Sequence, residues 1–336
     1  MPRPSAPGPT AILHGALLVD KPCGPTSHDV VAFARRTLQT PRVGHTGTLD
    51  PLATGLLVLL VGHATRLSQF LVTDEKEYLA DIRLGRSTET YDAQGLEESF
   101  RLKAEATGFQ GERASLEPGP ERSPSLESGS FRLQAEDVDR VLREFLGTFP
   151  QMPPPYSAKK IGGERAYKKA RRHEPVELRP VEVTLHAAEV VPSDDPTLLR
   201  LRITCSSGFY VRSLAHDIGQ RLGCGAHLEA LRRTRAGPFR VSDALSLDAL
   251  QAAGPAVEGR LVSLNALLAE MPAVTLTDEG ARRAANGNTL APAHLHAPFS
   301  GDRANRRIRV LDPSGRLVSV AETRADGLLH PLLVLR

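Results

Sequence analysis

The chain has 336 residues, of which 40% are hydrophobic and 24% are charged. This composition excludes a wholly disordered protein, and the length allows one large domain or two smaller ones. Lysine and arginine number 42 against 39 acidic residues, so the net charge of +3 does not by itself indicate a nucleic-acid partner.

The positive charge is concentrated in two segments rather than spread along the chain. Residues 156–179 hold eight basic and three acidic side chains, and residues 200–240 hold eight and two. Local fields of this kind attract a polyanion even when the charge of the whole chain is small. A basic run can equally be the solvated face of a helix, so composition leaves both interpretations open.

Cysteine usage and the N-terminal residues indicate a reduced, cytoplasmic protein. There is no CxxC pair and no even set of cysteines, which argues against a disulfide scaffold and a zinc site. The eleven histidines show no HExxH spacing, so we expect no metal. Residues 1–10 lack the apolar core of a signal peptide, and the apolar run 56–61 is too short to span a bilayer. The three cysteines are Cys23, Cys205 and Cys224.

The first third of the chain predicts strands, helices and one loop. Residues 13–20 predict a strand, and a helix follows with Ser27 as its N-cap. Residues 42–55 are rich in glycine and proline and predict a loop, which leads into a buried strand over 56–61. A short helix should come next, and the alternation of polar and apolar residues over 76–84 predicts a half-buried strand.

The middle of the chain changes in character. Glycine, proline, serine and glutamate dominate residues 96–134, which predicts a flexible surface insertion. Helical spacing of apolar residues returns over 135–146 and again over 211–222. Paired strands are predicted over 181–191 and 198–205.

The C-terminal part predicts a small separate β-domain. A boundary falls near residues 254–272, where Gly254-Pro255 and Met271-Pro272 flank a short apolar segment. Beyond this boundary, short strand-like runs alternate with turn signals, as in small all-β domains.

The densest cluster of possible functional residues is the segment 44–57, GHTGTLDPLATGLL. It lacks the GxxxxGK[ST] pattern of a phosphate loop, which argues against a nucleoside triphosphate site. What remains is a single carboxylate, Asp50, which Gly47 and Pro51 restrain directly before a buried strand. An Asp-Pro pair is also typical of an ordinary turn, so this pattern alone does not decide between structure and catalysis.

Three further features could bind RNA. Arg212 falls in the first turn of a predicted helix, where the dipole does not favour a cation, so either a fixed anionic partner or solvent surrounds it. Tyr78 is either a core tyrosine or a platform on which a base stacks. The segment 157–172, with Lys159 and Tyr167, interleaves basic and aromatic residues as an RNA-facing surface does.

Five blocks of the sequence occur in a recognisable order: GALLVDKPCGPTSHDVV, RVGHTGTLDPLATGLL, KEYLADIRLG, PPPYSAKKIGGERAYKKAR and CSSGFYVRSLAHDIGQRLGCGAHLEALRR. Together they resemble the bacterial TruB family of tRNA pseudouridine-55 synthases over roughly residues 13–95 and 135–240. The GHTGxLDPxATG block is highly specific. The C-terminal tail is similar to the family's PUA-type RNA-binding domain.

The resemblance implies an α+β fold. We expect a pseudouridine synthase core with a mixed, mainly antiparallel bent sheet flanked by helices, and a small C-terminal PUA-like β-domain. The corresponding domains are a disordered tail over 1–12, a catalytic domain over 13–260 that contains the 96–134 insertion, and an RNA-binding domain over 261–336.

The resemblance also implies roles for individual residues. Asp50 matches the catalytic aspartate, Tyr78 the tyrosine that stacks on the target uracil and could abstract a late proton, and Arg212 the arginine that pairs with the aspartate. Lys21 and Pro22 match a block that supports the structure. The expected substrate-binding residues are His45 beside the flipped nucleotides, Tyr210 and Leu231 at the uracil pocket, Arg66 where the family often has lysine, and Lys159.

The implied activity is conversion of uridine 55 in the T-loop of tRNA to pseudouridine. It requires no cofactor and no metal, its partner is the T-arm of tRNA, and we expect a monomer. Asp50 could attack C6 of the base or C1′ of the ribose, or assist formation of a glycal, and the sequence leaves these routes open. The sequence is also compatible with two alternative functions: a tRNA-folding chaperone with secondary catalysis, and a guide-RNA-dependent synthase that acts on ribosomal RNA. The absence of long basic extensions weighs against the second.

Overall fold

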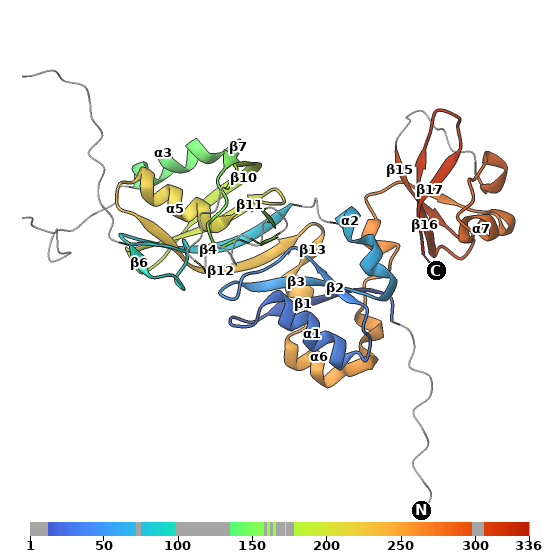
Figure 1. Ribbon diagram of the computed structural model, residues 1–336, viewed down its shortest axis with the longest axis horizontal. Helices are drawn as coiled ribbons and strands as arrows, with labels where there is room; N and C mark the ends of the chain where they lie inside the picture. The colour runs from blue at the N-terminus through green and yellow to red at the C-terminus, as the bar shows by residue number, and fades with distance from the viewer. Residues whose placement is uncertain are drawn as a thin grey trace, which may run out of the picture. The chain divides into compact units, whose positions relative to one another are not determined.

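The computed structural model describes residues 13–71, 75–98, 135–157, 160–161, 164–165, 172, 178–297 and 306–335 (Figure 1). The chain forms two compact units. The first unit combines residues 1–79, 204–207 and 231–336, and the second combines residues 80–203 and 208–230. Three strands have residues in both units: β4 (Lys76–Leu84), β11 (Leu198–Cys205) and β12 (Ala226–Ala236).

The largest sheet has nine strands and mixes parallel with antiparallel pairs. Its order is β1-β3-β12-β4-β11-β10-β7, and β2 and β13 pair with β3 and β12 beside this path. Strand β1 (Gly15–Lys21) pairs antiparallel with β3 (Thr54–Val61), whereas β12 pairs parallel with β3. A mixed sheet accompanied by helices confirms the predicted α+β class.

Burial explains why two of the predicted strands, β3 and β4, form where they do. Every residue of β3 except Thr54 is buried, as expected of a continuous apolar run. In β4, burial alternates with the two-residue period of a strand, and Tyr78, Ala80 and Ile82 face the core. The predicted span 76–84 is confirmed, and the strand predicted over 56–61 begins two residues earlier.

Two predictions near the N-terminus are wrong in detail. Helix α1 (Ser27–Thr37) has Thr26 as its N-cap, in a capping box with Asp29. Ser27 cannot serve as the cap because its hydroxyl is buried and bonded to the backbone of Leu49. The predicted loop also contains strand β2 (Val43–Thr46), which pairs antiparallel with β3.

The second unit contains the two helices predicted over 135–146 and 211–222 and most of the paired strands. Helices α3 (Ala135–Phe145) and α5 (Val211–Arg221) match the predicted ranges, as do β10 (Val181–Val191) and β11. The edge strand β7 (Gly147–Gln151) pairs antiparallel with β10. The predicted insertion lies outside the described residues except for its first three, which include β6 (Glu97–Glu98).

A separate four-stranded sheet forms near the C-terminus. Its order is β14 (Ala273–Thr275), β15 (Arg307–Leu311), β16 (Leu317–Thr323) and β17 (Leu329–Val334), and helix α7 (Asp278–Ala285) follows β14. Its buried core comprises Val274, Leu276, Ala284, Leu290, Ile308, Val310, Ala321 and Leu329. The small β-sheet is as predicted, while the boundary at residue 261 stays a prediction.

No helix among the described residues has the length and apolar character needed to cross a membrane. Short elements connect the parts described above. They are η1 (Gly62–Leu67), α2 (Ser68–Leu71), β5 (Ser87–Thr88), β8 (Lys160–Ile161), β9 (Glu164–Arg165), β13 (Phe239–Arg240), η2 (Val241–Asp243), α6 (Leu247–Ala253), η3 (Gly254–Arg260), η4 (Ala266–Leu268) and η5 (Pro292–His294).

Candidate active site

The loop that carries Asp50 is fixed on both sides of the carboxylate. The buried hydroxyl of Ser27 donates to the carbonyl of Leu49 at 3.0 Å and accepts from its amide at 2.8 Å. On the other side, the amide of Gly24 donates to the carbonyl of Pro51 at 2.9 Å. The backbone carbonyl of the half-buried Asp50 closes a turn by accepting from the amide of Ala53 at 3.1 Å. The carboxylate is therefore presented by a loop with a defined backbone, as a functional group requires.

A buried lysine ties this loop to the end of β1. The ammonium of Lys21, which is fully buried, donates to the carbonyls of Pro22 at 2.9 Å and Pro25 at 2.7 Å, and reaches that of Pro51 at 3.4 Å. Three donors thus meet three acceptors. Burial lowers the pKa of Lys21, and the negative charge of Asp50 acts in the opposite direction.

Arg233, on β12, is a further component that the sequence reasoning missed. Its side chain is buried, and Nε donates to the carbonyl of Leu56 at 2.6 Å while Nη2 donates to that of Gly47 at 3.1 Å. The backbones of Gly55 and Arg233 lie so close together that a Cβ on Gly55 would be 2.3 Å from the carbonyl oxygen of Arg233. One signal could have identified this residue: on a strand it shares a face with Leu231, two positions earlier.

Tyr78 contacts this arginine from β4. Burial raises the pKa of the Tyr78 hydroxyl, and the charge of Arg233 together with a hydrogen bond from it acts against that rise. The charge of Asp50 adds to the rise. The hydroxyl is consequently a neutral phenol at pH 7, and Asp50, Tyr78, Lys21 and Arg233 influence one another within the first unit.

His45 lies on β2 in the same unit, as a neutral ring. Burial, followed by the charges of His28 and Arg233, lowers its pKa to about 4. The rings of His28 and His45 meet edge to face with their centroids 5.7 Å apart. In the part of the chain that the structure describes, Nδ1 of His45 is buried without a hydrogen-bond partner. A neutral imidazole can both donate to and accept from a polar group of a bound nucleotide.

Arg212 belongs to the second unit, in the first turn of α5, where it forms a buried ion pair with Asp92. Its Nη1 lies 3.3 Å from Oδ2 of Asp92 and donates to the carbonyl of Thr90 at 3.2 Å. Nη2 donates to the carbonyl of Tyr156 at 3.0 Å. A fixed anionic partner is what an arginine at this end of a helix requires, and Asp92 was not singled out from the sequence.

The remaining predicted substrate-binding residues differ in their surroundings. The backbone of Tyr210 is fixed by the side-chain amide of Gln151 through bonds of 2.8 and 3.0 Å. Leu231 is buried on β12, and its carbonyl accepts from Thr54 at 3.3 Å. Arg66 is exposed and donates to the carbonyl of Val334. Lys159 lies outside the described residues.

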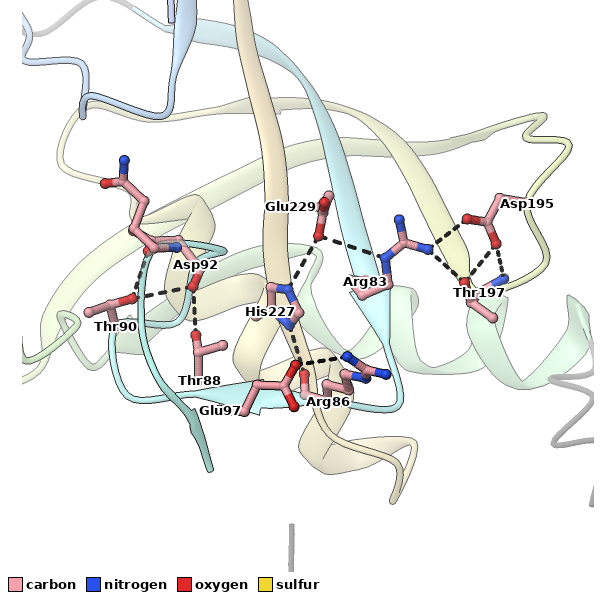
Figure 2. Close-up of polar contacts among 11 residues, drawn as sticks. Arg83, Arg86, Thr88, Thr90, Asp92, Glu97, Asp195, Thr197, His227 and Glu229 are labelled. Atoms are coloured by element: carbon pink, nitrogen blue, oxygen red, sulfur yellow. Dashed lines mark hydrogen bonds and ion pairs between the residues drawn. The ribbon is translucent and has the colours of Figure 1, made fainter. Parts of the chain in front are cut away.

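A polar pocket in the second unit offers a contrast (Figure 2). Its two arginines are already paired: Arg83 with Asp195 at 2.6 Å, and Arg86 with Glu97 at 2.8 Å. Both ring nitrogens of His227 are also engaged, with the Arg86 carbonyl and with Glu229. The charges compensate one another, so this pocket presents no free cation to a phosphate. Among the described residues, no group of three or more His, Cys, Asp or Glu could hold a metal ion.

Comparison with known proteins identifies the family. Residues 35–115 and 121–211 match the TruB family pseudouridylate synthase N-terminal domain, and residues 212–273 match the tRNA pseudouridylate synthase B C-terminal domain. The tRNA pseudouridine synthase B of Solibacter usitatus (strain Ellin6076) is 38% identical over 325 residues, which are 96% of this chain and 100% of that protein. The chain belongs to the TruB family.

Other relatives agree with this assignment to the TruB family. The tRNA pseudouridine synthase B of Thermobifida fusca (strain YX) is 41% identical over 328 residues, covering 95% of this chain and 98% of its own. Among solved structures, an H/ACA RNP bound to a substrate RNA containing 2′-deoxyuridine includes a chain with a TM-score of 0.68 at 22% identity, covering 97% of this chain and 86% of that one. A Cbf5-Nop10-Gar1 complex gives 0.67 at 23%, with the same coverage. At this identity the structures bear on the fold, and they agree with the mixed sheet described above.

Proposed function

We propose that this chain isomerises uridine to pseudouridine in tRNA, at position 55 of the T-loop, with Asp50 as the reacting carboxylate. The observation that carries the proposal is the immobilised Asp50 loop, which Ser27 and Lys21 fix in a chain that belongs to the TruB family. The proposal places the enzyme in the cytoplasm as a monomer.

The reaction is balanced without an added reagent. The N1–C1′ bond breaks, the base turns, C5 bonds to C1′, the proton leaves C5, and N1 gains a proton. A carboxylate can assist by attacking C6 of the base or C1′ of the ribose, or by promoting a glycal. No electrons leave the substrate, and the products contain the same atoms as the substrate. The chemistry itself therefore calls for neither a redox cofactor nor an added nucleoside triphosphate.

The neighbours of Asp50 suggest distinct tasks. Because the pKa of Tyr78 is raised, its hydroxyl is a poor proton acceptor, and this favours stacking on the uracil over abstraction of the C5 proton. Extruding a base from a folded loop costs a few kcal/mol, and stacking on an aromatic ring returns about 1–3 kcal/mol. Arg212 is proposed as a further catalytic residue, as the family resemblance implies, and its ion pair with Asp92 fixes its guanidinium.

Contacts with the tRNA backbone are proposed for the basic segment 156–179, with Lys159 as one of them, and for Arg66. Neutralised phosphates release counterions, so affinity should fall steeply with salt. Replacing Lys159 and its basic neighbours in this segment with glutamine should flatten the slope of log affinity against log salt by about one per contact. An unchanged slope would show that the segment is a solvated face.

The decisive experiment is a pseudouridine map of unmodified tRNA after incubation with the purified chain. Wild type should convert position 55, and Asp50→Asn should bind the tRNA but leave it unconverted. Asp243→Asn, which changes an exposed carboxylate of η2, is a matched control that should retain wild-type activity. Full conversion by Asp50→Asn, or conversion at other positions only, would overturn the proposal.

A further inference from the structure

A second contact lies beside the ion pair of Arg212 with Asp92, and it joins the same helix to the same loop. On α5, His216 lies one turn after Arg212, so both side chains leave the helix on the same face. On the loop between β5 and β6, Tyr91 directly precedes Asp92. The rings of Tyr91 and His216 stack with centroids 3.8 Å apart and an angle of 15° between their planes. Two adjacent loop residues therefore meet two helix residues one turn apart.

The backbone of Tyr91 has a conformation that side chains other than glycine rarely adopt. Its φ is +63°, in the left-handed region. Hydrogen bonds hold it on both sides: its amide donates to the carbonyl of Thr88 at 3.1 Å, and its carbonyl accepts from the amide of Leu228 at 3.0 Å. Strain of this kind persists only where the surroundings enforce it, and it is concentrated at functional sites.

The strained residue lies between the two loop groups that Arg212 contacts. The carbonyl of Thr90 and Oδ2 of Asp92 are both within reach of Nη1. The other oxygen of Asp92, Oδ1, already accepts from the Thr90 hydroxyl at 2.6 Å (Figure 2). It also accepts from the amide of Gln94 at 3.1 Å. Oδ2 is thereby directed toward the arginine. A change of φ at Tyr91 would shift these two acceptors relative to each other, so that both could no longer face Nη1 of Arg212.

We propose that the Tyr91–His216 stack is a positioning device that holds the loop in the conformation in which Thr90 and Asp92 orient the guanidinium of Arg212. Tyr91 and His216 are positioning residues, and neither needs to touch the substrate. This inference rests on the proposed role of Arg212 in the isomerisation. It predicts that the stack affects turnover and leaves tRNA affinity unchanged.

The test compares three replacements of Tyr91. Tyr91→Phe keeps the ring and should retain kcat within about twofold. Tyr91→Ala loses the ring in a residue that disfavours positive φ, and kcat should fall about tenfold, the effect of a lost aromatic contact. Tyr91→Gly loses the ring but adopts positive φ without strain, so it should retain more activity than Tyr91→Ala. KM for tRNA should stay within about twofold in all three.

The order of Gly and Ala distinguishes positioning from packing. If the ring only filled space, glycine would be the more damaging change, because it removes more contact and adds backbone freedom. A Tyr91→Gly variant less active than Tyr91→Ala would therefore overturn the proposal. Loss of affinity in place of turnover would also overturn it.

A double-mutant comparison tests the route through Asp92. In an Asp92→Asn background, Tyr91→Ala should reduce kcat by less than about twofold more, because the acceptor it positions is already impaired. A full tenfold further loss would contradict the inference. Should Tyr91→Ala fail to fold, His216→Ala removes the same stack from the helix side and should give the same loss of kcat, while His216→Phe restores it. His14→Ala, which disrupts a stacked pair in the first unit, is the control and should leave kcat unchanged.

The proposed function fails in a recognisably different way. A wild-type chain that makes no pseudouridine contradicts the function itself. An active wild type in which Arg212→Ala keeps its kcat contradicts the role of Arg212, and with it the positioning device. Only the pattern among Tyr91 variants, measured where Arg212→Ala is impaired, refutes the stack alone.

Discussion

Replacing Arg233 with methionine tests whether a buried arginine supports the candidate active site. The carbonyl of Leu56, which is fully buried, would lose a donor at 2.6 Å, and the carbonyl of Gly47 would lose one at 3.1 Å. A buried acceptor left without a partner costs about 1–3 kcal/mol. Relief from burying the charge offsets part of this loss. We therefore expect Arg233→Met to destabilise the chain by about 2–4 kcal/mol.

The adjacent arginine supplies a matched control. Arg232 forms a two-pronged ion pair with Asp20, at 3.0 and 2.7 Å, but its side chain is 41% exposed. Exposed pairs of this kind contribute about 0–1 kcal/mol. Arg232→Met removes the same charge from the same strand, so it should cost far less.

Thermal unfolding followed by circular dichroism measures the difference. The melting temperature of Arg233→Met should fall on the order of 5–10 °C, and that of Arg232→Met by less than about 3 °C. Equal melting temperatures of the two variants, or a melting temperature of Arg233→Met within about 2 °C of wild type, would show that Arg233 does not support the site. In that case the hydrogen bonds to Gly47 and Leu56 contribute nothing that water does not replace.

Three other changes test the environment of single groups. Burial raises the pKa of Asp217 to about 6 from its usual 3.8, so its protonated form stabilises the fold at low pH and this contribution is lost as pH rises through 6. In chemical denaturation at pH 8, Asp217→Asn should thus be more stable than wild type by about 1–2 kcal/mol, after allowance for solvent screening. Near pH 4 the two proteins should be equally stable. A difference that does not change with pH would contradict this. The ring of His45 should show no NMR titration between pH 5 and 8, because its pKa is about 4, and its pKa should rise in Arg233→Met; a midpoint near 6.5 in wild type would refute the burial argument. Lys21→Met should accelerate hydrogen exchange at the amide of Gly24, which bonds Pro51, and protection equal to wild type would show that Lys21 does not hold the loop.

Local periodicity was sufficient to predict the strands and helices that form the sheet and its neighbours. The alternation over 76–84 placed β4 at its true limits, and helical spacing placed α5 within one residue of its end. Errors arose where a long-range contact decides between local alternatives. Ser27 has the chemistry of an N-cap, but its bond to Leu49, 22 positions away, leaves that role to Thr26.

Of the candidate site, the sequence predicted the groups proposed to react and Lys21 as a support, but it missed Arg233 and Asp92. Asp50 and Tyr78 stand in recognisable blocks. Arg233 contacts Leu56 across 177 positions, and Asp92 contacts Arg212 across 120, so no local pattern connects them. Such partners become visible only once the strands are paired.

The first unit also explains how a chain of small net charge can present a site suited to an RNA. Two buried cations, Lys21 and Arg233, are fully engaged by backbone carbonyls or by Tyr78, and both act on the same loop as the single carboxylate Asp50. His45 is neutral, so it adds no charge. The two buried cations are held at fixed positions in a poorly solvated environment, where each acts more strongly than an exposed lysine would. Whole-chain charge is therefore the wrong quantity to consult, because the balance that a bound nucleotide meets is set by side chains that burial and hydrogen bonds fix in place.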